Sequence, residues 1–232
     1  SSLAIFSHPC PTVPYTDECG NLGILWNCNG HNTDRLSDKI PHKLQKRYVT
    51  LDLSFNRFSM LTEKTFENIA ALSVVSSIIL NHNKIIKIEN KTFHRLSGLC
   101  SLHLSNCELD KKGIEVEAFS YLHNLKILRI DQNYFQSDGY PDVALSTIQS
   151  LLSLHIDIFS GFSFTAPFKN LTNLAELKFH ILNDFSLTNT SFFGLRRSKI
   201  HRLGMCFHSY VFCDVTEDLI CSFPYIFMIF TN

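Results

Sequence analysis

The chain has 232 residues and carries 21 Lys and Arg against 21 Asp and Glu, so its formal net charge is zero. Nucleic-acid-binding domains often carry a strong basic excess, and this chain has none. Hydrophobic residues make up 45% of the sequence and include 20 Phe, which excludes a disordered chain and is enough to form a sizeable core.

Three cysteines, Cys10, Cys19 and Cys28, precede an internal repeat whose first copy begins at Tyr48. The terminal units of a repeat array expose apolar surface and need a cover. Cysteine-rich flanks are typical of proteins that fold in an oxidising, extracellular setting. We therefore predict a cysteine-bearing cap over residues 1–47 and a secreted or lumenal location.

The repeat follows the frame L-x-x-L-x-L-x-x-N/C-x-L, which resembles the leucine-rich repeat signature. Its copies begin at positions 48, 75, 99, 125, 151, 174 and 200, at intervals of 23 to 27 residues. Each of the first six copies has a second apolar position further on, at Phe66, Phe93, Phe119, Leu145, Phe168 and Phe192. The sequence therefore predicts about seven leucine-rich repeats over residues 48–205.

The two apolar residues of each L-x-L element point to the same side of a strand, because side chains alternate along it. One short strand cannot bury its apolar side alone, so successive coils must stack into a parallel sheet over a continuous core. The later apolar residue of each coil fills the convex side. We predict an α/β solenoid, a horseshoe segment with a concave parallel β-sheet and a disulfide-bearing N-terminal cap.

Cys107 occupies the frame position that holds Asn56 in the first copy. An asparagine there turns inward and bonds buried backbone groups, and a small thiol is a weaker substitute for it. A reactive thiol needs exposure and a lowered pKa, which an inward position does not offer. We predict a structural role for Cys107. Because Cys100 projects from the outer side of its strand, a pairing between these two cysteines is not expected.

The outward strand positions hold the candidate ligand-binding residues. These are His103, Arg129, Asp131, His155, Asp157, Lys178 and His180. Four of them lie between the two framework leucines of their coils: His103, Arg129, His155 and Lys178. Because parallel strands lie about 4.8 Å apart, these four side chains should form one row. The sequence leaves two interpretations open. Asp131 and Asp157 neutralise the row, or the row gains positive charge below about pH 6.5 and binds an anionic ligand in an acidified compartment.

Residues 206–232 lose the repeat pattern, and we predict an irregular apolar tail that is not a recognised C-terminal cap. The spacing of Cys206, His208, Cys213 and Cys221 matches no common zinc pattern, so no metal site is expected. The apolar stretch at 219–230 spans twelve residues and contains Pro224, whereas a membrane-spanning helix needs roughly 20. We expect no membrane span in this chain.

Catalytic signatures are missing from the sequence. There is no G-x-S-x-G, G-x-x-x-x-G-K-[ST] or H-E-x-x-H motif, so we expect neither an enzyme nor a cofactor. Glycosylation sequons begin at Asn90, Asn170 and Asn189, a number that chance alone would produce. Their positions in the repeat fall on the return side, where glycans would leave the strand face open.

The segments "CGNLGILWNC" (19–28), "KIPHKL" and "LDLSFN" resemble the N-terminal cap and first strand of extracellular leucine-rich repeat proteins. Together with the Phe-bearing coils, and with a stretch at 138–157 similar to one in invertebrate members, residues 15–205 look like part of a Toll-like receptor ectodomain. The resemblance implies a Cys19–Cys28 disulfide that closes a cap hairpin, with Cys10–Cys28 as the alternative.

The resemblance also implies a function. Such ectodomains bind microbial or endogenous ligands and dimerise. A membrane helix and a cytoplasmic signalling domain follow them in the family, and this sequence contains neither. The expected function is pattern recognition in innate immunity at the cell surface or in the endosome, with nucleic acid as a ligand unsupported by the net charge. The alternatives are a secreted or matrix leucine-rich repeat adhesion protein and a truncated, non-functional receptor fragment.

Overall fold

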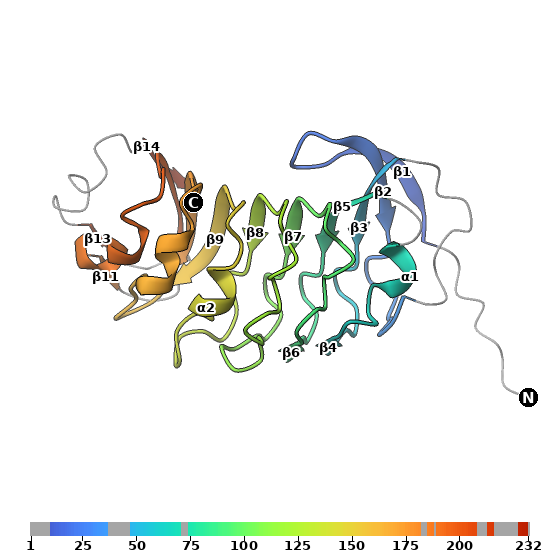
Figure 1. The fold of residues 1–232 in the computed structure, drawn as a ribbon, viewed down its shortest axis with the longest axis horizontal. Helices are drawn as coiled ribbons and strands as arrows, with labels where there is room; N and C mark the ends of the chain where they lie inside the picture. The colour runs from blue at the N-terminus through green and yellow to red at the C-terminus, as the bar shows by residue number, and fades with distance from the viewer. Residues whose placement is uncertain are drawn as a thin grey trace, which may run out of the picture.

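A computed structural model describes residues 10–36, 47–70, 74–181, 185–187, 189–207, 213–215 and 227–231. The chain is a parallel β-solenoid of about six turns with disulfides near its N-terminus. Figure 1 shows the strands side by side along the long axis, with a hairpin at the N-terminal end of the stack. The predicted leucine-rich repeat fold is confirmed.

The main sheet has the strand order β1-β2-β3-β5-β7-β8-β9-β10-β12-β14. Its strands are β1 (Thr12–Thr16), β2 (Leu22–Asn27), β3 (Tyr48–Asp52), β5 (Val74–Ile79), β7 (Ser101–His103), β8 (Ile127–Arg129), β9 (Ser153–Ile158), β10 (Glu176–Ile181), β12 (Arg202–Phe207) and β14 (Phe227–Thr231). The β1–β2 pair is antiparallel and every other pair in this sheet is parallel. The seven strands from β3 to β12 fall on the seven copies of the repeat.

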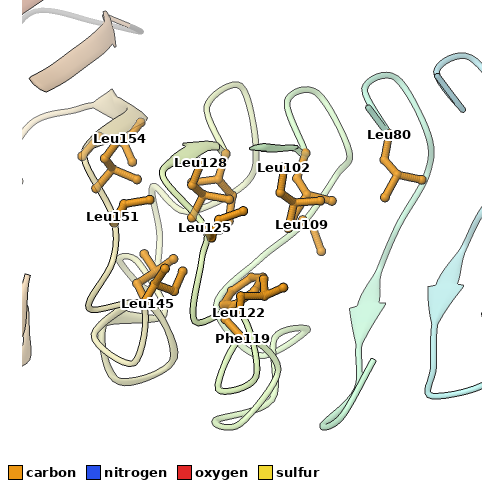
Figure 2. Close-up of a cluster of buried hydrophobic side chains, with 14 of the residues drawn as sticks. Leu80, Leu102, Leu109, Phe119, Leu122, Leu125, Leu128, Leu145, Leu151 and Leu154 are labelled. Atoms are coloured by element: carbon orange, nitrogen blue, oxygen red, sulfur yellow. The ribbon is translucent and has the colours of Figure 1, made fainter. Parts of the chain in front are cut away.

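The framework leucines form the core. Leu102, Leu128 and Leu154, from β7, β8 and β9, are each fully buried at matching positions of adjacent coils. Figure 2 shows these leucines in one line across the stack, with Leu122 and Leu145 beneath them. The alternation of the frame thus places one side of the repeat strands from β3 to β12 in a shared interior, as predicted.

The return side of each coil holds only short elements, because each coil must turn back within about 25 residues. They are β4 (Met60–Leu61), α1 (Glu67–Ala70), β6 (Lys87–Ile88), α2 (Asp142–Leu145), η1 (Ala166–Asn170), β11 (Phe185–Leu187), η2 (Asn189–Leu195) and β13 (Cys213–Val215). Phe66, Phe93 and Phe119 stack beneath them, with ring centroids 5.6 and 6.0 Å apart. The second apolar position of each of the first six coils is buried, as expected.

The inward asparagines join neighbouring coils. The Nδ2 group of Asn133 donates to the carbonyls of Leu104 at 2.8 Å and Ile130 at 2.9 Å. Its Oδ1 accepts from the amides of Cys107 at 2.9 Å and Leu109 at 3.1 Å. These four backbone groups lie in the buried turn at the strand ends, where an unpaired group would be costly.

Cys107 is fully buried at the same position of its own coil. Its thiol lies 3.2 Å from the carbonyl oxygen of Leu80 and 3.5 Å from that of Ser105. A thiol has one proton, so it satisfies one of these carbonyls at a time, whereas an asparagine amide satisfies two. Burial raises the pKa of the thiol to about 12. The structural interpretation of Cys107 is confirmed.

The C-terminal segment differs from the expectation of an irregular tail. Phe227–Thr231 forms β14 and pairs in parallel with β12, and Cys213–Val215 pairs in parallel with β11. The reason is the open edge of β12, since an unpaired strand edge attracts any neighbouring segment with strong β propensity. Of the rejected zinc pattern, His208 and Cys221 lie outside the described residues.

We predict that Asn133→Ala lowers the free energy of unfolding by roughly 2–4 kcal/mol, because it leaves two buried carbonyls and two buried amides without partners. Cys107→Ala, which removes one weak donor, should cost about 1 kcal/mol. Urea unfolding followed by circular dichroism measures both values.

The matched control is Asn124→Ala, which removes a single exposed bond from Nδ2 to the Ser97 carbonyl at 2.7 Å and should cost less than either change. Equal losses for Asn133→Ala and Asn124→Ala would show that the inward position does not stabilise the stack.

Candidate binding face of the sheet

Two disulfides fix the N-terminal cap. Cys10 pairs with Cys28, with Cα atoms 4.9 Å apart, and Cys19 pairs with Cys100, with Cα atoms 6.5 Å apart. The predicted Cys19–Cys28 bond is wrong, and the alternative Cys10–Cys28 bond is present. The six extended residues of β2 separate Cys19 from Cys28 by roughly 20 Å, whereas Cys10 lies opposite Cys28 at the base of the hairpin.

The second disulfide carries the hairpin tip across the sheet. The tip lies at the edge where the strands begin, and Figure 1 shows it extending from β2 past β5 to β7. The carboxylate of Asp17 shapes the turn by accepting from the backbone amides of Cys19 at 3.0 Å and Asn21 at 2.8 Å. Asp17 is itself buried. The tip is therefore a preformed turn tied to the third coil.

Glu18, at the tip, is the acidic partner that the sequence analysis missed. Its carboxylate lies 3.0 Å from Nε2 of His103, accepts from the Ser101 hydroxyl at 3.4 Å, and pairs with the guanidinium of Arg129. The hydrogen bond from His103 is the main cause that lowers the pKa of Glu18 to about 2, with the nearby charges of His103 and Arg129 acting in the same direction and burial opposing them.

The predicted row of side chains exists in register. His103 is paired with Arg129, Arg129 with His155, and His155 with Lys178 across β7, β8, β9 and β10. The row is not uniformly open, since His103 is only 6% exposed beneath the hairpin tip. The accessible part of the row therefore begins at Arg129.

The acid-switch hypothesis, in which the row gains positive charge below about pH 6.5, does not hold at His155. Burial lowers its pKa to about 3, and the positive charges of Arg129 and Lys178 act in the same direction. The ring therefore stays neutral at pH 5.5, and the face gains no charge from it on acidification.

Asp157 and Asp131 do not neutralise the row in the expected way. Asp157 is 1% exposed, accepts from the amides of Gln132 at 2.7 Å and Asn133 at 3.3 Å, and lies 3.2 Å from Nδ1 of His180. This contact is the main cause that raises the pKa of His180. Asp131 accepts from the Ser105 hydroxyl at 2.7 Å. These two carboxylates shape the strand ends.

Lys178 closes the described row. Its ammonium lies 3.6 Å from the carboxylate of Glu176, and the same carboxylate lies 3.6 Å from the guanidinium of Arg202. The Lys178 side chain extends over Gly204, where an added Cβ would come within 3.0 Å of its Cγ. The glycine thus makes room for the lysine side chain on the face.

Ser101, His103 and Glu18 form a trio of the residue types found in catalytic triads. The Ser101 hydroxyl lies 3.0 Å from Nε2 of His103, the same nitrogen that contacts Glu18. A triad uses the two ring nitrogens separately, one toward the nucleophile and one toward the acid. This trio therefore lacks the geometry of a relay.

The sequon asparagines lie away from the row. Asn90 is exposed at the end of β6, and Asn170 is exposed at the end of η1. Asn189 begins η2. All three belong to the return side of their coils.

The histidines give a test of the electrostatics. We predict that the ring signals of His180 titrate above pH 6.5, whereas those of His155 remain neutral down to about pH 3. The stabilisation from His180 is full below pH 6.5 and is lost as the pH rises through its raised pKa. His155 acts oppositely, because below pH 6.5 the unfolded chain binds a proton that the folded ring rejects.

NMR titration of the ring protons, assigned with His155→Gln and His180→Gln, measures both pKa values. Protonation of His155 near pH 6.5 would restore the acid-switch hypothesis for this face.

A second test concerns Glu18. Its lowered pKa means that the folded state gains stability above about pH 4.5 and loses it as the pH falls toward about 2. We predict that Glu18→Gln removes this component, so that the urea midpoint of the variant falls less steeply than that of the wild type between pH 4.5 and pH 2.5. Glu63→Gln, on the return side, is the control, and an unchanged slope in Glu18→Gln would contradict the role of the ion pair.

Comparison with known proteins agrees with this architecture. The family model "Leucine rich repeat" matches residues 47–109 and 73–135. Mimecan of Bos taurus is 29% identical over 169 residues, covering 64% of this chain and 50% of mimecan. Epiphycan of Gallus gallus is 27% identical over 207 residues, covering 79% of this chain and 60% of epiphycan. The chain thus spans between half and three-fifths of these curated relatives.

Solved structures show the same fold at low identity. Human 5T4 (Wnt-activated inhibitory factor 1, trophoblast glycoprotein) aligns with a TM-score of 0.68 and 17% identity over 98% of this chain and 82% of that chain. The TLR13–ssRNA13 complex aligns with a TM-score of 0.55 and 20% identity over 77% of this chain and 24% of that chain.

No helix in the described part of the chain is both long enough and apolar enough to cross a membrane. The repeat frame, the family-model match and the stacked parallel strands all point to the same fold. The chain has the leucine-rich repeat fold.

Proposed function

We propose that this chain is a non-catalytic interaction module of the extracellular matrix, which binds a protein partner on the open part of its sheet face. That part runs from β8 to β12 and presents Arg129, His155, Lys178 and Arg202. The observation that carries the proposal is the Cys19–Cys100 disulfide, which fixes the hairpin tip over the start of β7, so that His103 is covered while Arg129, Lys178 and Arg202 stay accessible.

The disulfides support an extracellular setting. Two of them join segments 18 and 81 residues apart in the sequence, and such bonds persist in oxidising compartments but are rare in the cytosol. In the chain-entropy model a closed loop of this larger size stabilises the folded state by about 4.5 kcal/mol. The disulfides of the cap therefore favour a protein that is secreted or displayed outside the cell.

The side chains of the face support binding. Glu18, Glu176 and Asp157 each hold cationic or protonatable neighbours in fixed pairs, so the face presents ordered charges. Such an array favours recognition by electrostatic complementarity. A leucine at the rim, Leu152, is 41% exposed and offers apolar contact area beside the charges.

The matrix assignment rests on the sequence relatives. Mimecan and epiphycan, the proteins matched over most of this chain, are matrix proteoglycans. The Toll-like receptor assignment is the second candidate. It is favoured by the in-register row of basic and protonatable side chains, but the neutral His155 removes one expected response to acid. The likeness to the TLR13 structure, at 20% identity, concerns the fold alone.

The test is retention of the purified chain on a cell-free matrix laid down by cultured fibroblasts. We expect the wild type to be retained and the double variant Lys178→Glu/Arg202→Glu to be lost, because the substitutions reverse two charges on the open face. Lys169→Glu, in η1 on the return side, reverses one charge away from the face and should be retained like the wild type.

Equal retention of all three proteins would contradict a role for this face in matrix binding. Binding of a single-stranded polyribonucleotide that strengthens from pH 7.5 to pH 5.5, with no matrix retention, would support the receptor assignment instead.

A further inference from the structure

The hairpin tip occupies only the first half of a groove. Along the edge where the strands begin, the outward residues beneath the hairpin are small and hydroxylated. Thr50, Ser77 and Ser101 succeed one another in register on β3, β5 and β7, and all three are buried. These small side chains leave room for the tip to lie close to the sheet.

The groove continues beyond the tip. A hollow of about 330 Å³ is lined by Glu18 and Cys19 on the hairpin side and by the starts of β8, β9, β10 and β12 on the other. Lys126, Leu152 and Arg202 are exposed in its wall. The strand edge that receives the hairpin tip therefore remains open over the next four coils.

The charges of the groove select an anion. Four cationic side chains line or adjoin it, namely Lys126, Arg129, Lys178 and Arg202, against the two carboxylates Glu18 and Glu176. If Glu18 withdraws, four positive charges face one negative charge. Within the groove, the side chains of Ser101, His103 and Arg129 already bind one carboxylate, that of Glu18.

We propose that this edge groove binds an acidic, extended peptide segment, and that the hairpin tip is a built-in competitor for its first half. Glu18 stands where a glutamate or aspartate of the partner would lie. The partner's chain continues past Lys126 toward Arg202. This inference rests on the proposed function and adds to it the chemistry of the partner and the means of exposing the site.

The competitor is held by a bond that can be broken. Cys19 is partly exposed, whereas Cys10 and Cys28, of the other disulfide, are 4% and 0% exposed. A dithiol reductant therefore has access to Cys19 and not to the buried cap disulfide. Cys107 is fully buried and takes no part.

A thiolate of the dithiol attacks Sγ of Cys19, the Cys19–Cys100 bond breaks, and Cys100 leaves as a thiolate that takes up a proton. The second thiol of the reductant then attacks the mixed disulfide and releases Cys19, which is protonated in turn. Two electrons and two protons pass to the protein, and the reductant leaves as its own disulfide. The tip is then free to leave Ser101, His103 and Arg129.

The experiment uses a fluorescent hexaglutamate peptide as the probe, with hexaglutamine as its control. We expect Cys19→Ser/Cys100→Ser to bind hexaglutamate at least about tenfold more tightly than the wild type, because a tethered competitor acts at a high effective concentration. Glu18→Gln, which keeps the disulfide and removes the competing charge, should give an intermediate affinity. Wild-type protein treated with a dithiol should match the double variant.

Two further variants locate the site. Adding Lys126→Glu and Arg202→Glu to the double serine variant should abolish the gain, whereas adding Lys169→Glu should leave it intact. Circular dichroism establishes that each variant is folded, and mass spectrometry after alkylation establishes which cysteines the dithiol reduces.

Equal affinity of the wild type, Glu18→Gln and the double serine variant would overturn the proposal, as would alkylation of Cys10 and Cys28 before Cys19 and Cys100. Binding of a sulfated oligosaccharide without binding of hexaglutamate would overturn the assignment of the partner as a peptide. Loss of the hexaglutamate effect together with normal matrix retention would refute this inference and leave the proposed function standing.

Discussion

A single coil of this chain cannot bury the apolar side of its own strand, and this deficit governs the rest of the architecture. Each coil shields its neighbour, so the leucines of β7, β8 and β9 lie in one continuous interior. The same dependence leaves the first coil without a cover. The hairpin β1–β2 extends the sheet beyond β3 and supplies that cover, with Cys10–Cys28 closing its base.

The cover also serves the sheet face. The hairpin tip extends over the sheet as far as the third coil, where the Cys19–Cys100 disulfide fixes it. One carboxylate at the tip then pairs with a histidine of the third coil and an arginine of the fourth. The β1–β2 hairpin, which covers the N-terminal end of the stack, thus also limits the part of the face that a partner can reach.

The buried polar groups follow one rule. Asn133, Cys107 and Asp157 differ in chemistry, yet each satisfies backbone groups at the turn that follows a strand. Asp157 acts as an acceptor and lies two positions before Phe159, which occupies the asparagine position of the frame in its coil. An unpaired buried amide or carbonyl is costly, which explains why bonding side chains lie at these turns.

The sequence by itself determined the solenoid, because short strands with the same apolar frame bury their leucines by stacking one coil on the next. It also determined the alignment of His103, Arg129, His155 and Lys178, because parallel strands of equal register bring equal frame positions together. The structural role of Cys107 followed from its place in the frame for the same reason.

Only the tertiary structure decided which cysteines pair and which charges meet. Glu18 lies 85 residues from His103 and 111 from Arg129 in the sequence, and no periodicity relates the cap to the coils. One signal was present, since a Cys10–Cys28 bond leaves Cys19 without a partner among the cap cysteines. The pKa of His155 was beyond sequence reasoning because it depends on burial among side chains from other strands, a property of the packed face and not of any segment.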